Sequence, residues 1–339
     1  MTQVAARSVS STTPARTPLG VLHRLTPYVA IARPDHWFKN VFMMLGVLLA
    51  GFYHPQRLAD PGIVVAIAWA VLATCLLASS NYVLNEILDA PTDRSHPVKR
   101  HRPIPAARAM RSIAYVEWLC LAAAGLLMAF AMNRAFFYTA VSFLVMGLIY
   151  NVPPLRAKDQ AFVDVLTESV NNPIRLMLGW FTLSATDIPP VSLLIAYWMI
   201  GAFFMASKRV AEYRFIADPI AAVAYRRSFR HYTQEMLLCS IVFYVTLFAL
   251  FLGIFIVRYH LELILLVPLI AGLVGYYLHI AFKQGSCAQN PERLYRETGL
   301  MIYLATLLLL FIGLMFVQVP LLYRLFNVEP SAVPPLWHL

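Results

Sequence analysis

The fold is decided by the stretch NEILDAPTD, residues 85–93, which ends a long apolar run and opens into a loop rich in arginine and lysine. Asn85, Asp89 and Asp93 are spaced four apart, so they share one face while the chain is helical. Acidic side chains at a membrane boundary are costly unless a cation holds them. The stretch therefore predicts a site for a metal ion and phosphate groups at a membrane surface.

The composition places this stretch in a membrane protein. Of the 339 residues, 60% are hydrophobic and 13% are charged, whereas a soluble domain carries about 25% charged residues. Apolar runs of about 17–25 residues, the length at which a helix crosses a bilayer, recur along the chain. The sequence therefore predicts an all-α polytopic membrane protein. The net charge of +10 is attributed to loops that face phosphates and anionic lipid, and no nucleic-acid partner is expected.

Nine membrane-spanning helices are expected from the apolar runs. They fall at about residues 38–53, 62–89, 112–131, 135–151, 161–182, 190–213, 236–257, 261–282 and 298–318. The loops on one side carry most of the cations, so the positive-inside rule puts the N-terminus in the cytoplasm and the C-terminus outside. Residues 1–26 are expected to be a disordered cytoplasmic tail, 27–320 the transmembrane domain and 321–339 an extracytoplasmic tail.

A second polar stripe lies on the expected helix at 161–182. Asp164, Glu168, Asn172 and Arg175 follow one another at spacings of four, four and three, so they share a face of an otherwise apolar helix. This helix runs opposite to the helix at 62–89, and the two stripes are expected to face each other across a central cavity that opens to the cytoplasm. Pro173 is expected to kink the second helix at this level.

The acids of the two stripes would repel one another in a low-dielectric setting. A divalent cation removes this repulsion, and oxygen ligands without clustered Cys or His suit Mg²⁺ or Mn²⁺ better than Zn²⁺. The acids that predict the metal site are Glu86, Asp89, Asp93, Asp164 and Glu168. The cations expected to bind phosphate are Lys99, Arg100, Arg102, Lys208 and Arg209. Metal and cations together would stabilise a diphosphate leaving group.

Each of these features also has a plainer interpretation. A single acid in a membrane helix can be a structural hydrogen-bonding group, and cationic loops are expected on the cytoplasmic side of any membrane protein. Glu212 is equally well interpreted as an ion-pair partner of Lys208 and Arg209. Two facing stripes together with Arg175 favour a functional site over these alternatives.

Residues 85–93 resemble the first Asp-rich motif of the UbiA superfamily of intramembrane prenyltransferases, Asn-Asp-x-x-Asp-x-x-x-Asp, with Glu86 in place of an Asp. Asp164-x-x-x-Glu168 resembles the second acidic motif, also with a Glu replacement. The resemblance implies a nine-helix domain whose cavity also opens laterally to lipid. It implies an enzyme that binds a phosphorylated donor through Mg²⁺ and takes an isoprenoid lipid from the bilayer.

Three further runs are similar to the decaprenyl-phosphate phosphoribosyltransferase branch. They are RPDHWFKN at 33–40, DRSHPVKRHRPI at 93–104 and KRVAE at 208–212. In that branch the donor is phosphoribosyl pyrophosphate and the acceptor is a polyprenyl phosphate. The resemblance implies that Asn85, Asp89 and Asp93 hold Mg²⁺ and the donor diphosphate, and that Lys39 joins the phosphate-binding cations.

The expected catalytic residues are Asp89, Asp93, Asp164 and Arg175, the last matching an arginine of that branch. Asn85, Glu168 and Asn172 are expected to contact substrate. The expected metal ligands are Asn85, Glu86, Asp89, Asp93 and Asp164. Glu86 reaches a methylene further than Asp, so it is expected to move the metal or to redirect its own contacts.

The sequence is compatible with three functions. The favoured one is a Mg²⁺-dependent transfer of phosphoribose to a polyprenyl phosphate, for the synthesis of lipid-linked sugars of the cell envelope. The second is a prenyltransferase that moves a prenyl group from a prenyl diphosphate to an aromatic or other small acceptor. The third is a transporter or lipid-binding protein without enzymatic activity, which lacks support from a convincing pair of Gly- or Pro-broken helices midway through the membrane. The sequence leaves open whether the protein forms a homo-oligomer.

Overall fold

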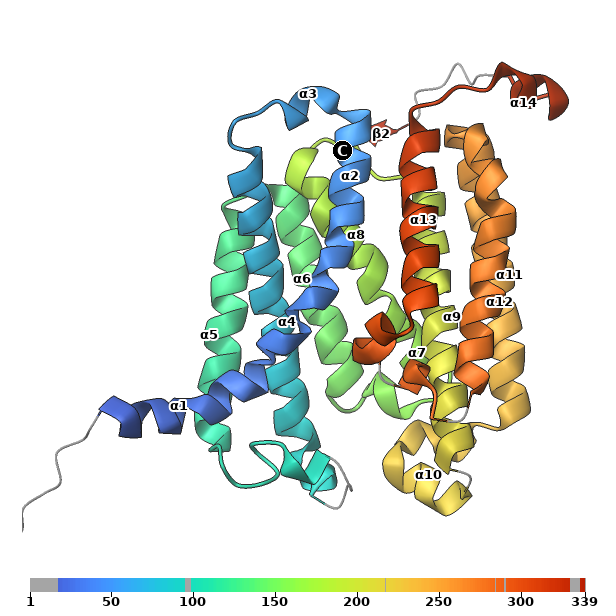
Figure 1. Ribbon diagram of the computed structural model, residues 1–339. Coiled ribbons are helices and arrows are strands. Elements are labelled where there is room, and N and C mark those ends of the chain that lie inside the picture. The colour runs from blue at the N-terminus through green and yellow to red at the C-terminus, as the bar shows by residue number, and fades with distance from the viewer. Residues whose placement is uncertain are drawn as a thin grey trace, which may run out of the picture.

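The computed structural model describes residues 18–94, 99–216, 218–283, 285–289, 291–329 and 336–338, and this part of the chain is almost entirely helical (Figure 1). The α-helices are α1 (Pro18–Ala32), α2 (Met43–Tyr53), α3 (Pro55–Leu58), α4 (Ile63–Asp93), α5 (Arg111–Phe130), α6 (Arg134–Asn151), α7 (Val163–Ser169), α8 (Asn171–Leu183), α9 (Val191–Ile216), α10 (Pro219–Tyr225), α11 (Gln234–Tyr259), α12 (Val267–Phe282), α13 (Thr298–Met315) and α14 (Pro320–Leu325). Short 3-10 helices are η1 (Pro34–Phe42), η2 (Lys99–His101), η3 (Ala157–Asp159), η4 (Arg227–His231), η5 (Leu261–Leu266), η6 (Cys287–Gln289) and η7 (Pro291–Arg296).

Within the described ranges, seven helices are long and apolar enough to cross a membrane, whereas nine were expected. The seven are α4, α5, α6, α9, α11, the η5–α12 segment and α13. The two remaining expected helices are present as shorter pieces. The helix expected at 38–53 is divided into η1 and α2, and the helix expected at 161–182 is divided into α7 and α8. The all-helical membrane architecture is therefore confirmed, and the count of nine crossings stays a prediction.

Helix α4 is longer than expected, and its length carries the whole first motif. It continues through Pro91 to Asp93, because a proline in the last turn of a helix removes only one of the final hydrogen bonds. Asn85, Asp89 and Asp93 consequently lie on one helical face, as their spacing predicts.

The second stripe is interrupted between α7 and α8. Helix α7 ends at Ser169 and α8 begins at Asn171, close to Pro173. The backbone nitrogen of a proline carries no hydrogen, so it cannot donate the hydrogen bond that a continuous helix requires. The amide of Asn171 satisfies carbonyls at the break, because its Nδ2 donates to the backbone oxygens of Thr167 at 3.4 Å and Glu168 at 3.1 Å. The kink expected at Pro173 thus takes the form of a break just before it.

Two glycines bring α2 against α8. A Cβ atom at Gly46 would lie 1.9 Å from the backbone oxygen of Leu176, and one at Gly179 would lie 1.8 Å from that of Met43. Only glycine permits backbones this close. The contact fixes the end of η1, which leads directly into α2, beside the middle of α8.

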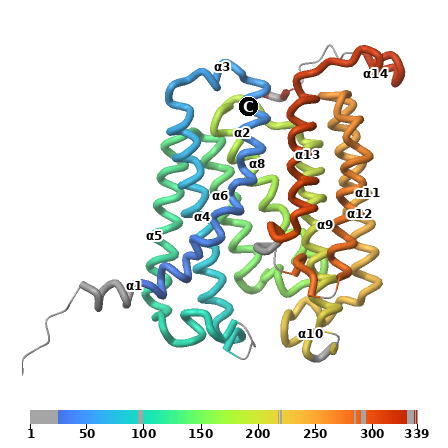
Figure 2. Tube along the Cα trace, viewed as in Figure 1, coloured from blue at the N-terminus to red at the C-terminus, as the bar shows by residue number. Residues whose placement is uncertain are grey.

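The described termini lie at opposite ends of the molecule. Helices α1 and α10 lie at one end, here called the α10 end, and α3 and α14 lie at the other (Figures 1 and 2). At the latter end Asp187–Ile188 (β1) pairs antiparallel with Trp337–His338 (β2). Residues 1–17 of the expected disordered tail lie outside the described residues, and residues 18–26 form the first part of α1.

Candidate active site

The first motif is surrounded by cations at the α10 end. Asp89 Oδ1 accepts hydrogen bonds from Arg156 at 2.8 Å and from Lys158 Nζ at 2.6 Å. Asp93 Oδ2 accepts one from Arg102 at 2.7 Å. The side chains of both aspartates are largely buried, so these ion pairs lie in a medium that screens charge poorly. The carboxylates and cations together form a compact region of alternating charge.

Arg156 and Lys158 were not among the predicted site residues. They follow α6 in a polar loop whose cations are expected in a cytoplasmic loop anyway, so nothing local distinguished them. The fold brings them onto Asp89, 67 and 69 residues away in sequence. Burial lowers the pKa of Lys158 to about 8, against the opposing effect of the Asp89 carboxylate.

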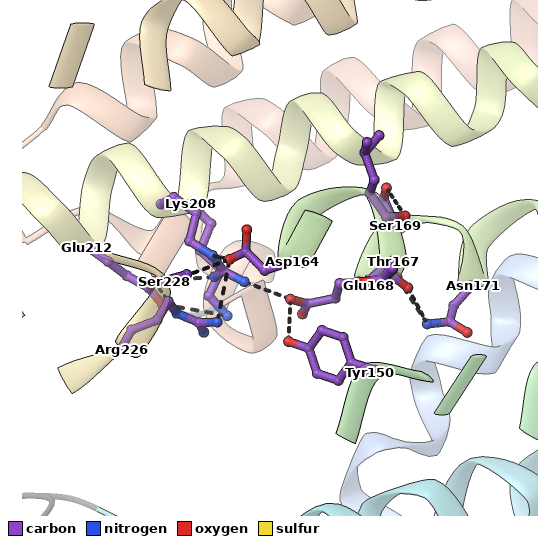
Figure 3. A network of polar contacts seen from close by, with 12 residues as sticks. Tyr150, Asp164, Thr167, Glu168, Ser169, Asn171, Lys208, Glu212, Arg226 and Ser228 are labelled. Carbon is purple, nitrogen blue, oxygen red and sulfur yellow. Dashed lines mark hydrogen bonds and ion pairs between the residues drawn. The ribbon is translucent and has the colours of Figure 1, made fainter. Parts of the chain in front are cut away.

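The second motif forms a buried ion network around Arg209, a residue without exposed surface. The guanidinium donates to Asp164 Oδ2 at 3.1 Å, Glu168 Oε2 at 2.7 Å and Glu212 Oε2 at 3.3 Å. Figure 3 shows Asp164 and Glu168 close to Lys208, Arg226 and Tyr150, with dashed contacts that join the two carboxylates to this network. Arg209 was predicted to bind phosphate, and in this network its guanidinium pairs with three carboxylates.

Asp164 is fully buried and has several donors. Its Oδ1 accepts from the Tyr232 hydroxyl at 2.7 Å, and its Oδ2 accepts from Ser228 Oγ at 3.1 Å in addition to Arg209. Tyr232 and Ser228 come from the segment after α10, which sequence patterns did not single out. With both oxygens occupied, Asp164 joins α7, α9 and η4 together.

Helix α6 connects the two acidic stripes through neighbouring residues. Asn151 Oδ1 accepts from Asn85 Nδ2 at 2.6 Å and from Lys158 at 2.9 Å, while Tyr150 donates its hydroxyl to Glu168 at 3.2 Å. Glu168 keeps 34% of its side chain exposed, unlike Asp164. The two stripes therefore border the same region, with the last residues of α6 between them.

The other predicted cations differ in their surroundings. Lys99 Nζ lies 5.9 Å from the ring centroid of Tyr225, and burial lowers its pKa. Lys208 pairs with Glu212 at 4.0 Å, Lys39 Nζ lies 3.1 Å from His36 Nδ1, and Arg100 is exposed beside His101. His96 and Pro97 of the run at 93–104 lie outside the described residues.

Glu86, which stands in place of an aspartate in the first motif, faces the loop that follows α4. Its Oε1 accepts a hydrogen bond from the backbone N–H of Ile104 at 3.0 Å, and the residue is 1% exposed. Ile104 packs in a small apolar cluster with Ile31, Val83 and Ile87. Glu86 therefore anchors the loop that carries Lys99, Arg100 and Arg102.

The remaining two predicted residues lie on α8. Asn172 packs against α9, where a Cβ atom at Gly201 would lie 2.4 Å from its Nδ2. Arg175 donates from Nε to Asn40 Oδ1 at 2.9 Å, deep among the helices.

The first motif is the part of the site that fits a divalent metal. Asn85 uses its amide nitrogen on Asn151, so its amide oxygen is the group available as a ligand beside Asp89 and Asp93. No three His, Cys, Asp or Glu side chains within the described ranges are grouped closely enough to hold a metal alone. This donor set suits Mg²⁺, which is commonly held by one or two carboxylates and completed by water and substrate phosphates. If the metal replaced the cations that now contact Asp89 and Asp93, those cations would become available to bind phosphate.

The comparisons with known proteins agree on one family. The sequence model of the UbiA prenyltransferase family matches residues 41–306. The chain is 32% identical over 214 residues to the decaprenyl-phosphate phosphoribosyltransferase of Mycolicibacterium smegmatis, a match covering 62% of this chain and 63% of that protein. It is 27% identical over 230 residues to the protoheme IX farnesyltransferase of Ectopseudomonas mendocina, covering 65% of this chain and 72% of that protein.

The fold agrees with a solved structure. A UbiA homologue from Archaeoglobus fulgidus bound to GPP and Mg²⁺ superposes with a TM-score of 0.63 at 19% identity, over 86% of this chain and 98% of that one. At this identity the likeness concerns the fold alone. The family match covers most of the chain, and the chain belongs to the UbiA prenyltransferase family of intramembrane transferases.

Proposed function

We propose that the protein is a Mg²⁺-dependent transferase that moves phosphoribose from phosphoribosyl pyrophosphate to a polyprenyl phosphate, for lipid-linked sugar synthesis in the cell envelope. The observation that carries the proposal is the region in which Asp89 and Asp93 are interleaved with Arg102, Arg156 and Lys158. Such a region offers both halves of a metal–diphosphate site. The mycobacterial relative supports the choice of donor and acceptor through its name.

The residues of the chain would act by binding and orientation. Asn85, Asp89 and Asp93 would hold Mg²⁺, or Mn²⁺ in its place, with the donor diphosphate. The metal would supply charge stabilisation for the leaving pyrophosphate. An oxygen of the lipid phosphate forms a bond to C1 of the ribose while the bond from C1 to the diphosphate oxygen breaks, and that electron pair leaves with pyrophosphate. The attacking phosphate is already anionic, so the step needs little help from a base.

The same proposal fixes the orientation in the membrane. With nine crossings, the N-terminus and the α10 end would face the cytoplasm and the C-terminus would lie outside. The soluble donor would then arrive at the α10 end, and the isoprenoid lipid would enter from the bilayer. Glu168 and the cations Lys39, Lys99, Arg100 and Lys208 would border the substrates. Asn172 and Arg209 would shape the site through α9.

Purified protein with Mg²⁺, phosphoribosyl pyrophosphate and a polyprenyl phosphate is expected to give a lipid-linked phosphoribose and one equivalent of pyrophosphate. Excess chelator should abolish product, and added Mg²⁺ should restore it, because the diphosphate cannot be held or leave without the metal. The lipid product is measured with radiolabelled donor. Absence of product across several polyprenyl lengths would sink the proposal.

The second candidate is prenyl transfer from a prenyl diphosphate to a small acceptor. It is favoured by the protoheme IX farnesyltransferase relative. Radiolabelled prenyl diphosphate offered with aromatic acceptors separates the two, since a phosphoribosyltransferase transfers no prenyl group to any of them.

The substitutions Glu86→Gln and Glu86→Asp are expected to show whether Glu86 anchors the loop after α4 or binds the metal. Gln keeps the length and the acceptor for the Ile104 N–H, so Glu86→Gln should change kcat/KM for the donor by less than about fivefold. Asp is too short, so Glu86→Asp should raise the donor KM by about tenfold as the loop loosens. Steady-state kinetics at saturating and limiting Mg²⁺ provide the measurement. The reverse order, with Asp active and Gln inactive and rescued by high Mg²⁺, would make Glu86 a ligand.

A further inference from the structure

One buried cation in the middle of the molecule has only neutral partners. Arg175 is 9% exposed, and its guanidinium contacts Asn40 Oδ1, the backbone oxygen of Asn171 at 3.3 Å and the ring of Phe143, whose centroid lies 5.0 Å from Cζ. None of the ion pairs between described residues includes it. The ionisable side chains that interact with it, Tyr82, Tyr197 and Cys75, are neutral at pH 7.

Arg209 shows how this chain otherwise treats a buried arginine. It is fully buried, and three carboxylates surround it. A guanidinium removed from water without a counter-charge is costly, the more so within a membrane, and such cations commonly mark binding sites. Among the described residues, Arg175 is therefore a cation without an anionic partner.

The guanidinium is also oriented in advance. Asn40 is 1% exposed, and its Nδ2 donates to Cys75 Sγ at 3.2 Å, which directs its Oδ1 to Arg175. The glycine contacts of α2 with α8 hold this asparagine in place. Two of the five N–H donors of Arg175 are used by the contacts above, and a phosphate matches the geometry of the remaining fork.

The position suits an anion that comes from the lipid. Arg175 lies seven residues beyond Glu168 and so about 10 Å further from the α10 end. On α4 it interacts with Tyr82, seven residues and thus about 10 Å from Asp89. A polyprenyl chain lies in the bilayer and presents its phosphate from that side, whereas a soluble donor arrives at the α10 end.

We infer that Arg175, oriented by Asn40, binds the phosphate monoester of the lipid acceptor, separately from the donor diphosphate at Asp89 and Asp93. The inference rests on the proposed function and adds which residues bind which phosphate. The donor carries a phosphate monoester of its own at C5, with the same chemistry, so the experiment has to distinguish the two sources.

The experiment measures binding, without turnover, of farnesyl phosphate and farnesol to purified full-length protein in detergent. The wild type is expected to bind the phosphate at least about tenfold more tightly than the alcohol, the effect of one charge-assisted hydrogen bond or more. Arg175→Gln should bind the two probes equally, and Arg175→Lys should retain part of the preference. Affinity for the donor with Mg²⁺ should stay within about twofold of wild type in both variants.

Controls keep the outcome decisive. Arg134→Gln removes an exposed cation at the opposite end and should leave the phosphate preference intact. Arg175→Gln must elute as a monodisperse peak; if it does not, the Arg175→Lys comparison carries the test. A wild type without phosphate preference, an Arg175 variant that retains the full preference, or one that loses donor affinity instead would each overturn the assignment. Failure of the proposed function would be seen separately, as wild-type protein that binds farnesyl phosphate but makes no product.

Discussion

Replacing Asp89 with asparagine is expected to lower kcat by at least about 100-fold, the scale of losing a group that stabilises charge in the transition state. Asp89 is central to the first motif, because it would hold the metal and it orders two cations, Arg156 and Lys158. Asparagine keeps the size and one oxygen but removes the negative charge. Both effects concern the leaving diphosphate, so the loss should fall on kcat and on the Mg²⁺ dependence rather than on the affinity for the lipid.

Kinetics as a function of Mg²⁺, together with the thermal stability of the purified variant, test this expectation. Asp60→Asn is the matched control, because Asp60 is an exposed acid just before the other end of α4 and caps only the N–H of Gly62. It should retain wild-type kinetics. An Asp89→Asn enzyme with more than about a tenth of wild-type kcat, or one that unfolds before it can be assayed while Asp60→Asn does not, would contradict the metal role.

Replacing Arg209 with methionine is expected to have the largest effect on stability, about 3–5 kcal/mol in the free energy of unfolding. The substitution keeps the volume and removes the shared partner of Asp164, Glu168 and Glu212. The buried carboxylates would then lose their closest counter-charge, and this is more costly than losing the attraction itself. Reversible unfolding by SDS of the protein in mixed micelles, followed by tryptophan fluorescence, provides the measurement.

The same experiment contains its control. Arg214→Met, on the exposed part of α9, should cost less than about 1 kcal/mol. In a double-mutant cycle, Arg209→Met combined with Asp164→Asn should be less destabilising than the sum of the two single substitutions by at least about 1 kcal/mol. The reason is that a neutral side chain at position 164 no longer needs the counter-charge of Arg209. Additive effects would show that the two residues act independently and that the network is not the source of stability.

Much of the fold follows from local patterns in the sequence. The length and hydrophobicity of each run predict membrane helices, and most observed helices begin and end within a few residues of the expected positions. The one-face arrangement of Asn85, Asp89 and Asp93 follows from the helical period alone. The broken helix at α7 and α8 follows from a single proline, whose effect on the backbone does not depend on distant residues.

Those patterns do not predict which acidic side chains are held by protein groups and which can bind a metal. Asp164 and Glu86 were predicted as metal ligands from their position in the motifs, and in the structure they are held by Arg209 and by the Ile104 N–H. Their roles as metal ligands stay predictions, and the proposed site does not depend on them. Arg156 and Lys158 went unassigned because their partner Asp89 is far away in the sequence. A sequence motif specifies the residue type and the helical face. The side chains packed around each carboxylate determine whether it is available to bind a metal.

The sequence by itself determined that this is a helical membrane transferase of the UbiA type and placed the residues 85–93 on one helical face, because helical period and hydrophobic length are local properties. Only the tertiary structure decided which cation faces which anion. It gave Arg209 three carboxylates and, within the part of the chain that the structure describes, gave Arg175 none, although both are buried arginines. The physical reason is that the free-energy cost of a buried charge depends on all the groups packed around it. Close contacts such as that of Gly46 in α2 with α8 bring together groups that are far apart in the sequence.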